Sequence, residues 1–192
     1  MKVTKITNLP VQDNEGRLYY TVRVDTDAGI HGLGEVGISN WGRAIANAVD
    51  HLGELVIGAD PWDTEKLWQE MFRSGYFPAD KVYCCAISAI DIALWDIKGK
   101  SVNLPTYKLL GGQVREKVVC YPHIKGTDKQ QIVEGSKRAV DEGWKFVRWG
   151  QPDPWGSFES GGISIIEPDK SMRLAVELMG EVREAVGPDI QI

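Results

Sequence analysis

The sequence has few cysteines, no long apolar run and no block of basic residues. Its three cysteines are an odd number, and Cys84 is adjacent to Cys85, so together with Cys120 they form neither a disulfide framework nor a zinc-binding spacing. The longest apolar stretch, 82–87, is far shorter than the roughly 18 residues that a membrane-spanning helix needs. No Lys/Arg run exceeds two residues, and 22 Lys+Arg against 27 Asp+Glu give a formal net charge of −5. These absences exclude membrane proteins, secreted disulfide scaffolds and nucleic-acid binders, and they favour the cytoplasm.

The composition is that of a globular protein, with 43% apolar and 26% charged residues over 192 positions. This length allows one domain and an incomplete second one. In the first part, Tyr20, Val22 and Val24 alternate with polar residues, which is typical of a half-buried strand. With strand-like segments on either side and a turn at 27–29, the region 2–37 is predicted to be an antiparallel meander of three strands.

Helical spacing of apolar residues follows the meander. It predicts helices over 41–57, from 64 to 72 with Asp63 as N-cap, and over 82–100. The third helix is apolar on almost all sides, which indicates burial. Asp91 lies within it, and for this carboxylate a structural hydrogen-bonding role is favoured over a catalytic one.

The pattern changes near residue 112, where a glycine pair ends the helical region. Short apolar strands are predicted at 118–121, 145–149 and 189–192, with helices at 128–141 and 169–186 and a polar, glycine-rich loop at 150–168. Strands alternating with single helices predict βαβ units and a parallel sheet. Because the chain ends four residues into the third strand, we expect it to be part of a longer protein.

The segment 32–37, Gly-Leu-Gly-Glu-Val-Gly, matches the phosphate-binding pattern of dinucleotide folds. In those folds the glycines join a parallel strand to a helix, whereas here they follow a hairpin turn. Alternate glycines at Gly32 and Gly34 therefore favour the close approach of another backbone segment. A nicotinamide-dependent oxidoreductase is kept as an alternative that depends on this motif alone.

Residues 86–111 carry a longer pattern, formed by Asp91, Ala-Leu-Trp-Asp at 93–96, Gly99-Lys100, Pro105 and Leu-Leu-Gly at 109–111. This pattern resembles the signature of the mandelate racemase/muconate lactonizing branch of the enolase superfamily, with Thr106 as a departure where an aliphatic residue is usual. The resemblance covers essentially the whole chain. It implies an α+β capping domain over residues 1–112, followed at 113–192 by the first part of an α/β (β/α)8-type barrel that is truncated in the third strand.

Barrel enzymes place their chemistry at the carboxyl ends of the strands. There the chain carries His123 after the first barrel strand and Arg148 at the end of the second. An imidazole can donate and accept, and a guanidinium can clamp oxygens in a bidentate manner, so the pair suits a polyhydroxy carboxylate. A packing histidine and a salt-bridged arginine are the structural alternatives.

The resemblance sharpens this prediction. Racemases and cycloisomerases of the branch end the second strand in Lys-x-Lys, whereas this sequence has Arg148 and Gly150. An arginine here, a histidine-plus-glycine turn after the first strand, and Asn40 in a capping loop are similar to acid-sugar dehydratases of the mannonate and galactonate type. The resemblance implies Arg148 as a catalytic residue, with Asn40 and His123 binding the substrate. The tyrosine that can assist the arginine in those relatives is absent from 150–168, which disfavours mannonate as the specific substrate.

The implied parent enzyme is a magnesium-dependent hydro-lyase of carbohydrate-acid catabolism. A base removes the proton α to the carboxylate, Mg²⁺ stabilises the enediolate, and the β-hydroxyl leaves as water. The family's metal ligands follow strands three to five, so they are expected beyond Ile192 and none is assigned here. The complete protein is expected to be a homo-oligomer, and the 192-residue chain alone to be inactive.

Two further alternatives stay open. One is a racemase or cycloisomerase of the same superfamily. The other is a non-catalytic binding module, if the 192 residues are the whole product.

Overall fold

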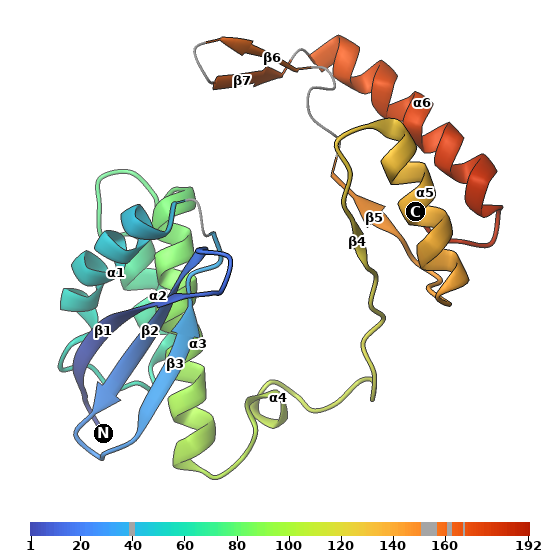
Figure 1. Cartoon of the computed structure of the whole chain (residues 1–192). Helices are drawn as coiled ribbons and strands as arrows, with labels where there is room; N and C mark the ends of the chain where they lie inside the picture. Colours follow the sequence, from blue (N-terminus) through green and yellow to red (C-terminus); the bar gives the residue numbers. More distant parts are fainter. Residues whose placement is uncertain (39–40, 151–156, 161–162, 167) are drawn as a thin grey trace. The chain divides into compact units, whose positions relative to one another are not determined.

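A computed structural model describes residues 1–38, 41–150, 157–160, 163–166 and 168–192, with only the backbone given at 157–160 and 163–166. It divides the chain into two compact units, Met1–Val114 and Arg115–Ile192 (Figure 1). Each unit has its own apolar core. The two are therefore described separately.

The first unit begins with an antiparallel sheet of order β1-β2-β3. Its strands are β1 (Val3–Gln12), β2 (Leu18–Thr26) and β3 (His31–Glu35). Val22 and Val24 on β2 are fully buried and lie opposite Gly34 and Gly32 on β3. The meander predicted from the alternation is confirmed.

Helices cover one face of this sheet (Figure 1). α1 (Gly42–Val56) and α3 (Lys81–Ser101) pack on the sheet, and α2 (Thr64–Phe72) packs against these two helices. The short α4 (Thr106–Leu109) follows α3 and lies away from the sheet (Figure 1). Asp80 caps α3, since its side chain accepts hydrogen bonds from the backbone N–H groups of Val82 and Tyr83 at 3.0 and 3.2 Å. The core joins buried side chains of the sheet and three helices, including Val22, Ile45, Leu52, Leu67, Ile87, Ile90 and Leu94.

Gly32 and Gly34 allow α3 to lie directly against β3. A Cβ atom built on Gly32 would stand 1.9 Å from the carbonyl oxygen of Ala93, and one on Gly34 would stand 1.9 Å from that of Ala89. Both distances are far below any non-bonded contact. The alternate glycines serve close backbone packing, as predicted, and this position leaves no room for a dinucleotide phosphate.

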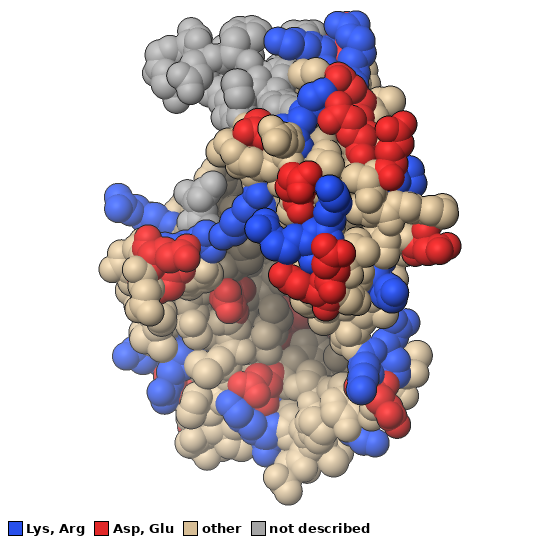
Figure 2. Space-filling view, turned by 45° about the vertical axis from the view of Figure 1, so that its right-hand side comes forward, with Lys and Arg blue, Asp and Glu red and all other residues tan. Residues whose placement is uncertain are grey.

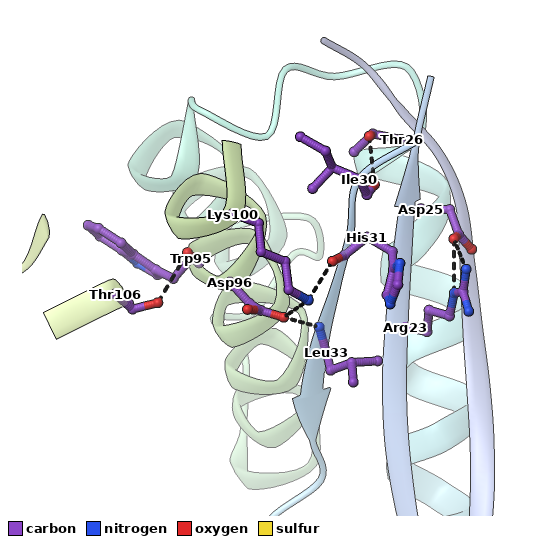
Figure 3. Close-up of polar contacts among 10 residues, drawn as sticks. All are labelled: Arg23, Asp25, Thr26, Ile30, His31, Leu33, Trp95, Asp96, Lys100 and Thr106. Atoms are coloured by element: carbon purple, nitrogen blue, oxygen red, sulfur yellow. Dashed lines mark hydrogen bonds and ion pairs between the residues drawn. The ribbon is translucent and has the colours of Figure 1, made fainter. Parts of the chain in front are cut away.

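A charged network fixes the same interface (Figure 3). The Asp96 carboxylate accepts a hydrogen bond from the Leu33 backbone N–H at 2.9 Å and pairs with Lys100 at 2.7 Å. Lys100 in turn donates to the carbonyl oxygen of His31 at 2.8 Å. The spacing of Asp96 and Lys100 in the sequence predicts an i,i+4 pair, which the structure confirms, and this pair also holds the edge of β3.

Thr106, the departure from the family pattern, lies where the chain turns back after α3. Its hydroxyl is 3.5 Å from the carbonyl oxygen of Trp95 (Figure 3). A Cβ on Gly99 would stand 2.7 Å from the carbonyl oxygen of Leu104 and 3.3 Å from the Thr106 hydroxyl. Gly99 has no side chain, and this leaves space for the Thr106 hydroxyl.

Asp91 is partly buried on α3, and the predicted hydrogen-bonding role is not seen. Within the described part of the chain only long-range electrostatic interactions reach its carboxylate. Burial raises its pKa, nearby Lys98 opposes this shift, and Glu65 adds to it. The spacing alone could not reveal this, because a helical pattern does not show where the hydrogen-bond donors of other elements lie.

We expect Asp91→Asn to raise the free energy of unfolding at pH 7. The pKa of Asp91 is higher in the folded state than in the unfolded chain, where it is near 3.8. The contribution of this group to the free energy of unfolding is therefore fully present below the unfolded-state pKa and is lost as the pH rises through the folded-state pKa. Asparagine carries no charge, so the substitution restores this contribution at pH 7. The gain in the free energy of unfolding should be less than about 1 kcal/mol, because the carboxylate is partly solvated. Thermal unfolding at pH 7 and pH 3 should show a gain only at pH 7, and exposed Glu54→Gln should show no such difference. A loss of stability at pH 7 would mean that attraction to Lys98 prevails.

The second unit alternates strands and helices. It contains β4 (His123–Ile124), α5 (Lys129–Asp141), β5 (Arg148–Trp149), β6 (Ser157–Ser160), β7 (Ile163–Ile166) and α6 (Pro168–Val186). β4 and β5 are parallel, and a further parallel bridge joins Phe146 to Gln191. A core that includes Ile124, Ile132, Val147, Leu178, Val182 and Ile190 lies between strands and helices. The predicted βαβ arrangement is confirmed.

Three details of this unit differ from the sequence prediction. The first strand is at 123–124 and not at 118–121, because only the later residues meet a neighbouring strand. An antiparallel hairpin, β6 with β7, interrupts the region predicted to be a loop. The helical spacing of apolar residues in 169–186 predicts Met172 on the inward face, but Met172 is 62% exposed, because α6 buries mainly Leu178 and Val182.

Charges of both signs are interspersed on the surface that Figure 2 displays. In the second unit, Lys129 of α5 pairs with Glu177 and Glu181 of α6 and so ties the two helices together. None of the described helices is long and apolar enough to cross a membrane.

Candidate functional site

The candidate site is built on the ends of the two short parallel strands. In the register of β4 and β5, His123 lies beside Arg148, and Ile124 lies beside Trp149. Side chains that are neighbours across a sheet project to the same face. The structure therefore brings the two residues predicted from the strand ends onto one face.

The opposite face anchors this pair. Ile124 is 9% exposed and Val147 is 3% exposed, and both pack into the core against the helices. His123 and Arg148 themselves are exposed. A buried residue next to each functional residue fixes the backbone, while the functional side chains are left accessible.

A tyrosine that the sequence analysis did not select completes the group. Tyr121 accepts a hydrogen bond from Nη1 of Arg148 at 3.0 Å, and the guanidinium carbon lies 5.7 Å from the centre of its ring. Tyr121 lies just outside β4, two residues before His123, and its hydrogen bond to Arg148 is what places it at the site. No strand period selects it from the sequence.

Gly150 leaves the space beside His123 open. A Cβ atom at this position would stand 4.0 Å from Nε2 of His123. A side chain there would begin in ordinary van der Waals contact with the imidazole. The exposed group offers an imidazole, a phenol and a guanidinium.

The sequence analysis also predicted a substrate-binding asparagine and placed the metal ligands outside this chain. Asn40, predicted to bind substrate from a capping loop, lies outside the described residues. Within the ranges that the structure describes, no group of three or more His, Cys, Asp or Glu side chains is placed to hold a metal ion.

Comparison with known proteins agrees with the geometry of the first unit. Residues 5–111 match the family model described as "Mandelate racemase / muconate lactonizing enzyme, N-terminal domain". This range takes in the meander, the helices α1 to α3 and the Asp96–Lys100 network. It amounts to more than half of the chain.

The similarity to complete proteins extends through the second unit. The D-galactonate dehydratase of Pectobacterium atrosepticum is 34% identical over 191 residues, covering 100% of this chain and 47% of that protein. A solved enolase from Pantoea ananatis, with bound d-gluconate and Mg, is 25% identical with a TM-score of 0.79, covering 98% of this chain and 52% of that one.

A third relative catalyses a different reaction, according to its name. The 3,6-anhydro-D-galactonate cycloisomerase from Zobellia galactanivorans is 28% identical with a TM-score of 0.74, covering 99% of this chain and 49% of that one. The chain thus spans about half the length of the relatives it matches.

Proposed function

This chain belongs to the mandelate racemase/muconate lactonizing enzyme family of the enolase superfamily, and from that premise we propose that the complete protein is a magnesium-dependent acid-sugar dehydratase. The observation that carries the proposal is the 34% identity to a D-galactonate dehydratase along the entire chain. Residues 1–112 would form the capping domain, and 113–192 the first part of a (β/α) barrel domain. The parallel strands and intervening helices of the second unit support this assignment.

The proposed substrate is a sugar acid, and each predicted residue has a role toward it. Arg148 would donate hydrogen bonds from a permanently charged guanidinium to developing negative charge on substrate oxygens. His123 would exchange a hydrogen bond or a proton with a hydroxyl group, and Asn40 would reach the substrate from the cap. The accessible positions of His123 and Arg148 on one face support these roles.

The metal belongs to the complete protein in this proposal. Mg²⁺ binds hard carboxylate oxygens and would stabilise the enediolate formed after removal of the α-proton. The gluconate- and Mg-bound relative supports a magnesium cofactor. Its ligands are expected beyond Ile192. We also expect a homo-oligomer in the cytoplasm.

A cycloisomerase is the second candidate, because one structural relative carries that name. Arg148 and Gly150 at the end of the second strand disfavour it, since the lysine pair expected for racemases and cycloisomerases is absent. The open space beside Nε2 of His123 agrees with this difference.

The test is dehydration of D-galactonate and D-gluconate by the complete protein with Mg²⁺. We expect a 2-keto-3-deoxy acid from at least one of the two, loss of activity after chelation, and recovery when Mg²⁺ is returned. Activity that is unaffected by chelation would contradict the metal assignment. Failure to dehydrate any member of a wider set of sugar acids would contradict the function.

A further inference from the structure

The contact between Tyr121 and Arg148 is not explained by packing. Tyr121 is 49% exposed, and Arg148 is also exposed, so neither side chain is held by the core. They nevertheless meet in two ways, through a 3.0 Å hydrogen bond and through the ring face, 5.7 Å from the guanidinium carbon. Two simultaneous contacts define the orientation of the guanidinium more tightly than one.

The chemistry of the two groups sets the direction of the hydrogen bond. A guanidinium has only donors, so the Tyr121 oxygen must accept. One N–H of Arg148 is thereby used, and the remaining N–H groups stay available to a ligand. An arginine side chain without such a contact samples many rotamers and must lose that freedom when it binds.

Tyr121 is placed to influence the candidate site and little else. It comes two residues before His123 in the chain and contacts Arg148, the register partner of His123. It is also the only tyrosine after residue 107 in the sequence. No other phenol of the second unit can therefore make this contact.

We propose that Tyr121 is a positioning residue that holds the Arg148 guanidinium in its binding orientation beside His123. The inference rests on the proposed function for its catalytic consequence, but the positioning itself is a property of this chain. Tyr121→Phe keeps the ring and removes the accepting oxygen, so it isolates the hydrogen bond. Tyr107→Phe is a matched control, because Tyr107 is 45% exposed with its ring centre 5.6 Å from Nζ of Lys108.

The first readout needs no activity. In the 192-residue chain, the NMR order parameter of the Arg148 Nε–H group should fall in Tyr121→Phe and stay unchanged in Tyr107→Phe. An Arg148 that keeps its order in Tyr121→Phe would overturn the positioning role.

The second readout uses the complete protein and an accepted sugar acid. We expect Tyr121→Phe to lower kcat on the order of tenfold, with a smaller change in KM, because a misoriented guanidinium loses contacts made mainly in the transition state. An unchanged kcat in an active enzyme would overturn the catalytic consequence. If the unmodified protein dehydrates no sugar acid, the proposed function fails, and the NMR result still decides whether Tyr121 holds Arg148.

Discussion

Gly34→Ala is expected to unfold the first unit or to destabilise it by at least about 3 kcal/mol. The new methyl group would stand 1.9 Å from the Ala89 carbonyl oxygen and 3.3 Å from the Ala89 Cα. A backbone oxygen in the middle of α3 cannot turn away as a flexible side chain can. The helix would have to move off β3 and break the hydrogen bond between Asp96 and the Leu33 backbone N–H.

Gly37→Ala provides the matched control, because it changes the last glycine of the same Gly-x-Gly-x-x-Gly sequence. A Cβ on Gly37 meets no atom within 4 Å. Its stability should stay within about 0.5 kcal/mol of the unmodified chain, as for an ordinary surface substitution. Chemical denaturation of the three proteins measures both values. Equal tolerance of alanine at both positions would refute the close-packing role of Gly34.

Arg148→Met should lower kcat/KM of the complete enzyme for its sugar acid by roughly 10²- to 10⁴-fold. Methionine keeps much of the aliphatic length but removes the charge and every donor. Fold stability should change little, because Arg148 is exposed and its one direct partner among the described side chains is Tyr121.

Arg173→Met controls for the loss of a positive charge. Arg173 lies on α6, is 70% exposed at its side chain and pairs with Asp169 on the same helix. Steady-state kinetics should place this variant within about twofold of the unmodified enzyme. If Arg148→Met were equally active, the strand-end arginine would have no part in the reaction.

Local patterns predicted the first unit well because its elements are long. Alternation on β2 and helical spacing in α1 and α3 each extend over enough residues to define a buried face. The role of Gly32 and Gly34 could also be predicted, since alternate glycines in a strand indicate that another backbone segment comes close. In such cases the sequence pattern and the packing requirement coincide.

The second unit was harder to predict because its strands are only two residues long. Hydrogen bonding to a neighbour, and not hydrophobicity, decides that β4 begins at His123 and that 118–121 stays outside the sheet. The β6–β7 hairpin has a glycine pair, Gly161-Gly162, between its strands in the sequence, and this signal was missed within a polar segment.

His123 and Arg148 could be selected from the sequence, because strand ends gather chemistry in a barrel. The contact of Tyr121 with Arg148 could not be predicted in this way. A contact between two exposed side chains depends on rotamers, which no sequence period encodes.

The most direct test of the central claim is to run the reaction of the complete protein in D₂O with Mg²⁺ and an accepted sugar acid, followed by NMR. A dehydratase removes the C2 proton, expels the C3 hydroxyl and takes a solvent proton at C3 when the enol becomes a ketone. The account predicts a 2-keto-3-deoxy acid that carries deuterium at C3. Deuterium at C2 of an otherwise intact sugar acid, with no loss of water, would show a racemase or epimerase and contradict it.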